Sequence, residues 1–278
     1  MNEPLSEDIS AGDDSHSGHW ERPSVFRNRY EKIAVYGVIA LFLVWSIWDL
    51  RIEPMRLLSG LGSGWELVSR MFPPDFGPRE RDLILSGTIE SLAMSVVATV
   101  IGVIVSVPIA FMAASNMAPR PVYVVGRAIV AISRSLHYLV ISIITVKAVG
   151  FGALAGVLAL VFATPGFFAK LLAEDLEDIS TEQLDAIRAT GASPLQVIVY
   201  GVFPQVLPRF VGLAVYRWDI NIRASTIIGI VGAGGIGSTL LSSFQRYDYG
   251  FSMAIITVIV VIVIAGEVVS AYVRRRMQ

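Results

Sequence analysis

The chain has 278 residues, of which 54% are hydrophobic and only 16% are charged. Soluble domains average about 45 to 50% apolar and about 25% charged residues, so this composition disfavours a soluble fold and favours a membrane protein. Lys and Arg number 22 against 23 Asp and Glu, and the net charge of -1 gives no sign of nucleic-acid binding. The absence of Cys excludes a disulfide scaffold, a thiolate zinc site, an iron-sulfur cluster and a cysteine nucleophile.

The first 32 residues are polar and acidic, and we expect them to form a disordered cytoplasmic tail. They lack the layout of a cleavable signal, because no small-residue cleavage site follows the first apolar segment. His16 and His19 in this tail resemble a short metal-binding tract. A flexible segment does not fix ligand geometry, so we interpret the tract as solvated and predict no metal site.

Six segments approach or exceed the roughly 20 apolar residues that a helix needs to cross a bilayer core of about 30 Å. We therefore predict an all-α, polytopic membrane protein with six transmembrane helices, the third and fourth of which form a helical hairpin. In chain order the predicted spans are residues 33–48, 91–119, 129–149, 148–169, 207–231 and 249–272.

Residues 189–208 are also free of charge, but Pro and Gly residues interrupt them repeatedly. These interruptions are Pro194, Pro204, Pro208, Gly191 and Gly201. We therefore predict a pair of short helices at the membrane surface between the fourth and fifth spans.

The orientation follows from basic residues near the span ends, which favour the cytoplasm. Four precede the first span, Arg120 and Arg127 follow the second, and three Arg lie at residues 274–276. This distribution predicts that both termini are cytoplasmic. Five Arg in the predicted outer loop oppose this orientation, although five acidic residues accompany them.

Charges inside the predicted spans are informative, because each costs about 2.5 to 3.5 kcal/mol at a helix centre. The densest group lies at residues 216–223. In a structural interpretation, Arg217 pairs with Asp219 or snorkels to the interface, and His137 makes a polar contact between helices. In a functional interpretation, guanidinium groups line a path for a phosphate-like anion. The candidate path residues are Arg134, His137, Arg217, Asp219 and Arg223.

Residues 232–237 fit the pattern G-x-G-x-x-G of dinucleotide-binding turns. The context disagrees, because no alternation of strands and helices surrounds the motif and the next acidic residue, Asp248, is too close. We interpret the glycines as close helix packing or an irregular turn or, in a functional interpretation, as non-helical backbone that faces a cavity and forms a gate. They are Gly232, Gly234, Gly235 and Gly237.

Signatures of catalysis are absent from the sequence. It contains no G-x-x-x-x-G-K-[ST], H-E-x-x-H or G-x-S-x-G motif, so we expect no ATP hydrolysis and no enzymatic activity on this chain.

The segment 185–191, followed by Pro204 thirteen residues after Gly191, resembles the E-A-A, Gly, I-x-L-P signature of ABC importer permeases. Asp185, Ile187, Gly201 and Phe203 depart from that signature. The resemblance implies a cytoplasmic knob in which a short helix, a turn at Gly191 and a second helix ending at Pro204 fit a cleft on a separate ATPase. The coupling residues that it implies are Asp185, Ala186, Arg188, Gly191, Ala192 and Pro204.

Residues 216–217, 221–226 and 231–237 are similar to permeases of the phosphonate and phosphite importer group, as are residues 72–76 and 152–160. The resemblance covers the chain from about residue 71 to the C-terminus. Together with the composition and the apolar segments, it predicts three regions: a tail at 1–32, the first transmembrane helix and outer loop at 33–82, and a permease core at 83–278.

This resemblance also implies the assembly. It consists of a homodimer in the bacterial inner membrane, two ATPase subunits that hold ATP and Mg, and an extracytoplasmic phosphonate-binding protein. We expect membrane lipid as a further partner, and neither a cofactor nor nucleic acid on this chain. The alternatives are a permease for phosphate or an amino acid such as methionine, a membrane-embedded enzyme acting on lipid phosphate, and a channel.

Overall fold

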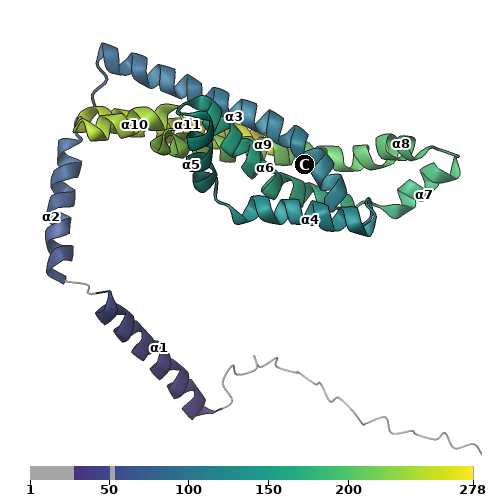
Figure 1. Cartoon of the computed structure of the whole chain (residues 1–278), viewed down its shortest axis with the longest axis horizontal. Helices are drawn as coiled ribbons and strands as arrows, with labels where there is room; N and C mark the ends of the chain where they lie inside the picture. The colour runs from purple at the N-terminus through teal and green to yellow at the C-terminus, as the bar shows by residue number, and fades with distance from the viewer. Residues whose placement is uncertain (1–27, 51–53, 278) are drawn as a thin grey trace, which may run out of the picture. The chain divides into compact units, whose positions relative to one another are not determined.

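The computed structural model describes residues 28–50 and 54–277, and every regular element in these ranges is a helix (Figure 1). The all-α expectation is therefore confirmed. The chain divides into two compact units, residues 1–62 and residues 63–278. Most of the predicted tail, with both of its His residues, lies outside the described residues. The predicted boundaries at residues 32 and 82 stay predictions.

α1 (Arg29–Asp49) forms the first predicted span, and none of its residues is buried. A helix that is apolar on all sides suits a lipid environment. Within the predicted outer loop, the structure adds α2 (Pro54–Arg70). Exposed apolar side chains at Leu58, Leu61 and Trp65 follow a helical spacing, but three intervening Gly residues conceal this helix in the sequence.

Three long helices form the centre of the second unit: α3 (Pro78–Ala113), α6 (Ala153–Glu177) and α9 (Phe203–Ile228). α3 packs against both of the others, as Figure 1 shows. A Cβ added at Gly102 of α3 would lie only 2.7 Å from Cβ of Thr164 on α6. Small residues thus allow the close backbone approach on which helix packing in membranes depends.

The third predicted span, residues 129–149, is wrong as a single helix. α4 (Arg120–Ser135) and α5 (Tyr138–Val149) meet at an angle of 89°. The backbone is extended at Leu136 and His137, and Nδ1 of His137 accepts the N–H of Leu139 at 3.3 Å. His137 therefore caps the second helix and satisfies one of its otherwise unpaired donors.

α4 and α6 are joined where Pro165 interrupts the hydrogen bonds of α6. The N–H of Gly166 and the carbonyl of Phe162, one turn apart across this proline, both bond Ser133 of α4. Its Oγ donates to Phe162 O at 2.7 Å and accepts from Gly166 N at 2.9 Å. A side chain inserted in this way locally opens a helix and fixes its neighbour in position.

The resemblance correctly implies a short helix followed by a turn at Gly191, but the end that it implies for the second helix at Pro204 is wrong. α7 (Thr181–Ala189) ends at a turn in which Gly191 has a φ of +81°. The second helix, α8 (Pro194–Val197), does not end at Pro204, because the π-helical turn η1 (Ile198–Val202) joins it to α9. The wider π turn relieves the clash that Pro204 would make with the carbonyl of residue 200 in an α-helix.

After α9, the 3₁₀ turn η2 (Gly229–Val231) leads to α10 (Ile236–Gln245) and then to α11 (Tyr249–Met277). Figure 1 shows α10 and the α7–α8 pair at opposite ends of the bundle. Among the described residues, five helical segments are long and apolar enough to cross a membrane, and six if α4 and α5 form one broken span. The six-span prediction agrees with this number.

Candidate translocation path and coupling segment

Arg217 is buried near the middle of α9, with only 6% of its surface exposed. Its Nε donates to Thr164 Oγ1 on α6 at 3.2 Å, and the guanidinium carbon lies 6.0 Å from the centre of the Phe167 ring. No carboxylate in the described part of the chain forms an ion pair with it. A buried guanidinium without a counter-charge is costly in a membrane protein, which marks this position as a functional candidate.

Arg217 lines a cavity of about 320 Å³ between α4, α6 and α9. The cavity brings together three of the predicted path residues, Arg134, His137 and Arg217, and adds Lys170. None of its lining residues is acidic. They are Ser133, Arg134, Leu136, His137, Tyr138, Ala163, Gly166, Phe167, Lys170, Leu171 and Arg217.

The basic groups of this cavity differ in how far they are paired. Lys170 Nζ lies 3.0 Å from a carboxylate oxygen of Glu174, whereas no ion pair or hydrogen bond within the described residues holds the side chain of Arg134. His137 uses Nδ1 as an acceptor at the start of α5, so its proton in the neutral state is on Nε2, which is then a donor. The cavity therefore contains positive charge and donors without matching acceptors.

Sequence analysis missed Lys170, because the predicted fourth span ends at residue 169 and the following residue falls outside it. The signal was its spacing. Ala163, Gly166 and Lys170 follow one face of a helix at intervals of three and four residues, the face that meets Arg134.

Asp219 and Arg223 lie on another face of α9 and do not line this cavity. Arg223 Nη2 is 2.7 Å from Asp219 Oδ2, so the alternative in which Asp219 pairs with Arg217 is wrong. Side chains two residues apart on an α-helix point in nearly opposite directions, so Arg217 and Asp219 lie on different faces of α9. Asp219 instead faces Gly266 of α11, where an added Cβ would lie 3.7 Å from Oδ1.

The coupling segment, α7 with the turn that follows it, is anchored to the bundle by Leu184. This side chain is buried, and a Cβ at Gly201 would lie 2.7 Å from Leu184 Cδ2, which explains why Gly replaces the Ile of the family signature there. Most other side chains of α7 are exposed, and an ion pair of 2.9 Å joins Asp185 to Arg188. Five of the six predicted coupling residues lie in α7 or its turn: Asp185, Ala186, Arg188, Gly191 and Ala192.

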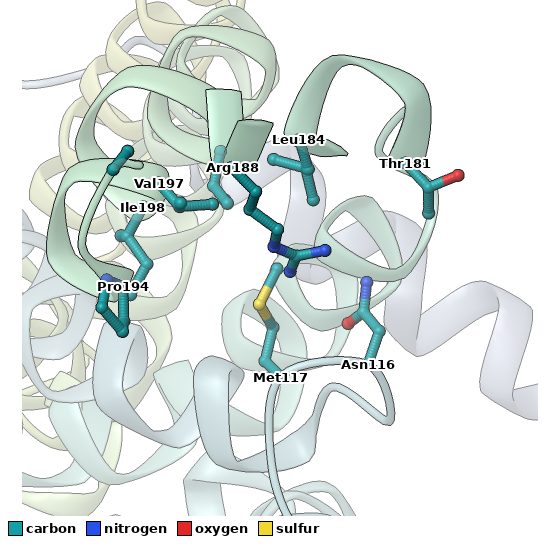
Figure 2. Close-up of a pocket in the computed structure, with 10 residues that line it drawn as sticks. Asn116, Met117, Thr181, Leu184, Arg188, Pro194, Val197 and Ile198 are labelled. Atoms are coloured by element: carbon teal, nitrogen blue, oxygen red, sulfur yellow. The ribbon is translucent and has the colours of Figure 1, made fainter. Parts of the chain in front are cut away.

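A second cavity, of about 590 Å³, lies behind this segment. Figure 2 shows the Arg188 guanidinium directed toward Asn116 and Met117, in the loop after α3. The coupling segment therefore packs on the bundle through Leu184, and the cavity lies beside that contact.

The glycine-rich segment forms the packed junction between α9 and α10. Gly232, Gly234 and Gly235 have φ values of +90°, +79° and +73°, a region that favours glycine. Gly232 O accepts the N–H of Gly152 at 3.0 Å, and Ile236 N donates to Ser91 Oγ at 2.9 Å. The residues before this turn are helical, so the strand that a dinucleotide site requires is not present in the described structure.

The fourth predicted glycine of this group, Gly237, lies at the start of α10 against α9. A Cβ there would meet the backbone carbonyl of Thr226 and would lie 3.0 Å from Gly229 Cα. This position has no space for a side chain, as the close-packing interpretation requires.

Comparison with known proteins gives a consistent result. Residues 106–278 match the family described as binding-protein-dependent transport system inner membrane component. The chain is 42% identical over 246 residues to the phosphite transport system permease protein of Stutzerimonas stutzeri, covering 88% of this chain and 87% of that relative. It is 35% identical over 257 residues to the phosphate-import permease protein of Mycolicibacterium smegmatis, covering 92% of this chain and 48% of that longer protein.

Among solved structures, the fold is similar to a chain of the MetNI methionine ABC transporter in an inward-facing conformation. The TM-score is 0.64, and the match covers 73% of this chain and 100% of the other. Sequence identity is 23%, so this similarity concerns the fold alone.

Proposed function

The chain belongs to the family of inner-membrane components of binding-protein-dependent transport systems, and on this premise we propose that it imports phosphonate or a related phosphorus oxyanion. It is the permease subunit of an ABC transporter and not an enzyme, since its relatives are permease proteins. Its partners include an ATPase and a substrate-binding protein. ATP and Mg bind to the ATPase, consistent with the lack of a P-loop sequence in this chain.

The assembly contains two copies of this chain and two ATPase subunits. Both termini lie in the cytoplasm, which places α7 and its turn on the ATPase side and the α9–α10 junction on the side of the binding protein. Basic residues at the C-terminal end of α11, Arg274, Arg275 and Arg276, support this orientation.

The observation that carries the oxyanion assignment is the cavity between α4, α6 and α9. It combines Arg134, Lys170 and Arg217 with no lining carboxylate. A phosphorus oxyanion loses much of its hydration free energy on entering a membrane, and arginine side chains replace that hydration with directional donors. A neutral solute would leave the positive charges of the lining uncompensated. The ammonium group of a zwitterionic solute would find no acidic partner in the lining.

Coupling follows from the continuous helix that runs from Pro194 through η1 into α9. When the ATPase subunits close on ATP, they move α7 and its turn, and α8 transmits this displacement to the part of α9 that contains Arg217. The same motion changes which side of the membrane the cavity faces, which is alternating access.

The test is ATP hydrolysis by the assembled transporter in lipid nanodiscs, with the binding protein loaded in turn with methylphosphonate, phosphite, phosphate or methionine. We expect phosphonate or phosphite to raise turnover above the value with unloaded binding protein. Stimulation by methionine alone would overturn the oxyanion assignment and leave the ABC permease assignment intact. If no ATPase co-purifies with the chain, the coupling interpretation fails as well.

A further inference from the structure

Arg217 has more hydrogen-bond donors than its surroundings have acceptors. A guanidinium group has five N–H groups, and the described residues provide one acceptor, Thr164 Oγ1, for the Nε–H at 3.2 Å. The four N–H groups on the two terminal nitrogens have no acceptor from the described residues, although 94% of the residue surface is covered. These nitrogens are not among the fully buried polar atoms of the described residues, so they open onto the cavity, where a ligand or water can accept their hydrogen bonds.

Other donors line the same cavity from different helices. Arg134 comes from the end of α4, His137 from the bend before α5, and Lys170 from α6. Lys170 shares its charge with Glu174, which leaves two Arg residues without a counter-charge from the described residues. The cavity volume of about 320 Å³ corresponds to roughly ten water molecules, which is room for an anion and part of its hydration shell.

We propose that this cavity is a discrete binding site for one tetrahedral phosphorus oxyanion, with Arg217 as its principal contact and Arg134 as its second. The inference rests on the proposed function and adds a stopping point within the path. The three oxygens of such an anion point apart, which suits a cavity lined by donors from α4, α6 and α9. A planar carboxylate engages one guanidinium fork and leaves the others unpaired.

Thr164 has a positioning role in this site. By accepting the Nε–H, it fixes the edge of the guanidinium against α6 and leaves the two terminal nitrogens for the ligand. The cavity is therefore organised before the anion arrives, which lowers the entropic cost of binding.

The experiment measures binding to the full chain in nanodiscs without the binding protein, which would itself hold the ligand. The probes are methylphosphonate and phosphite, followed by ³¹P NMR line broadening, because their signals are distinct from those of phospholipid. We expect saturable broadening with wild-type protein and a loss of affinity of at least about tenfold in Arg217→Gln, or ~1.4 kcal/mol.

Two further variants keep the result interpretable if Arg217→Gln fails to fold. Arg134→Gln changes an exposed side chain and should weaken binding severalfold without affecting the fold. Arg209→Gln is the matched control for Arg217→Gln, because Arg209 is also on α9 but pairs with Asp175 at 2.8 Å and does not line this cavity. Its affinity should equal that of wild-type protein.

Equal binding by wild-type protein and by both cavity variants would overturn the proposal. So would the absence of saturable binding to wild-type protein at millimolar probe while phosphonate-loaded binding protein still stimulates the ATPase. In that second case the proposed function stands, and the path has no discrete site. Failure of the proposed function itself would appear separately, as stimulation by another solute only.

Discussion

Ser133 is the residue on which the packing of α4 against α6 depends most directly. Its hydroxyl bonds both Phe162 O and Gly166 N of α6, an acceptor and a donor one turn apart across Pro165. We expect Ser133→Ala to remove both of these interhelical hydrogen bonds and to destabilise the protein by about 1 to 3 kcal/mol. Thermal unfolding in nanodiscs measures the effect.

Ser135→Ala is the control for that variant. Ser135 is exposed on the same helix and donates only to the carbonyl of Ile132, so its removal should have little effect. Equal melting temperatures for the two variants would show that the inserted hydroxyl is not a structural element.

Gly126 holds α4 against the end of α3. A Cβ there would lie 2.6 Å from the backbone carbon of Met112, whereas a Cβ at Gly212 of α9 would meet nothing within 4 Å. Gly126→Ala should therefore destabilise the fold by about 1 to 3 kcal/mol through overpacking, while Gly212→Ala should be neutral or slightly stabilising. Yield and thermal stability of the two purified variants, compared side by side, decide whether backbone contact at Gly126 matters.

Charge within apolar sequence predicted five path residues, and three of them line the cavity: Arg134, His137 and Arg217. It did not separate them from Asp219 and Arg223, because the face of a helix to which a side chain points depends on its neighbours. The distinction requires knowledge of the crossing of α4, α6 and α9, which charge and depth alone do not contain.

At the scale of helices, α11 presents a feature that sequence analysis overlooked. Glu267 is exposed within this apolar helix and has no ion-pair partner among the described residues, while the adjacent Val268 is 62% exposed. A carboxylate that faced lipid here would cost roughly 2.5 to 3.5 kcal/mol, so we expect its side of the helix to face water. The lack of Cys in the chain makes this testable by single substitutions.

We expect Glu267→Cys to react with a membrane-impermeant thiol reagent at least about tenfold faster than Val268→Cys, because only the thiolate exposed to water reacts readily. The two positions lie at the same depth and point about 100° apart. Labelling yields by mass spectrometry give the comparison. Equal, slow labelling of both would place Glu267 in lipid or in a dry contact.

The turn after α7 gives another prediction at this scale. Gly191 and Gly150 both have positive φ values, and a Cβ added at either would meet nothing within 4 Å, so Ala at either adds backbone strain of at least about 1 kcal/mol without a steric clash. Gly150 also has a ψ of 175°, a region that essentially only glycine adopts, so Gly150→Ala is the more strained of the two variants. Gly191→Ala should lower the ATPase stimulation by loaded binding protein by at least about tenfold, or ~1.4 kcal/mol, and Gly150→Ala should lower it much less. A similar loss in both would indicate general destabilisation.

Hydropathy predicted where the membrane-spanning segments lie, since apolar length is a local property. It did not predict how they are interrupted. The bend at His137 depends on a cap, and the passage through Pro204 depends on a π turn; both are details of backbone hydrogen bonding that charge-free runs do not reveal.

For the whole molecule, the stoichiometry of the transporter is the most direct test of the assembly. We expect native mass spectrometry of the complex to give two copies of this 30.2 kDa chain and two ATPase subunits. A complex with one copy of this chain and one paralogous permease would contradict the homodimer and retain the family assignment. Co-expression of the chain with and without related permeases distinguishes these results.

The continuity of α8, η1 and α9 also constrains how the sequence can change. Every residue inserted into an α-helix turns all later side chains by about 100° and advances them by about 1.5 Å. An insertion between Pro194 and Arg217 would rotate Arg217 out of its cavity relative to α7, whereas an insertion in the loop near Asn116 would not alter the phase of any helix. The coupling segment at one end and the Arg217 cavity at the other therefore both fix the number of residues between Pro194 and Arg217. Insertions there should be selected against even where every inserted residue is a good helix former.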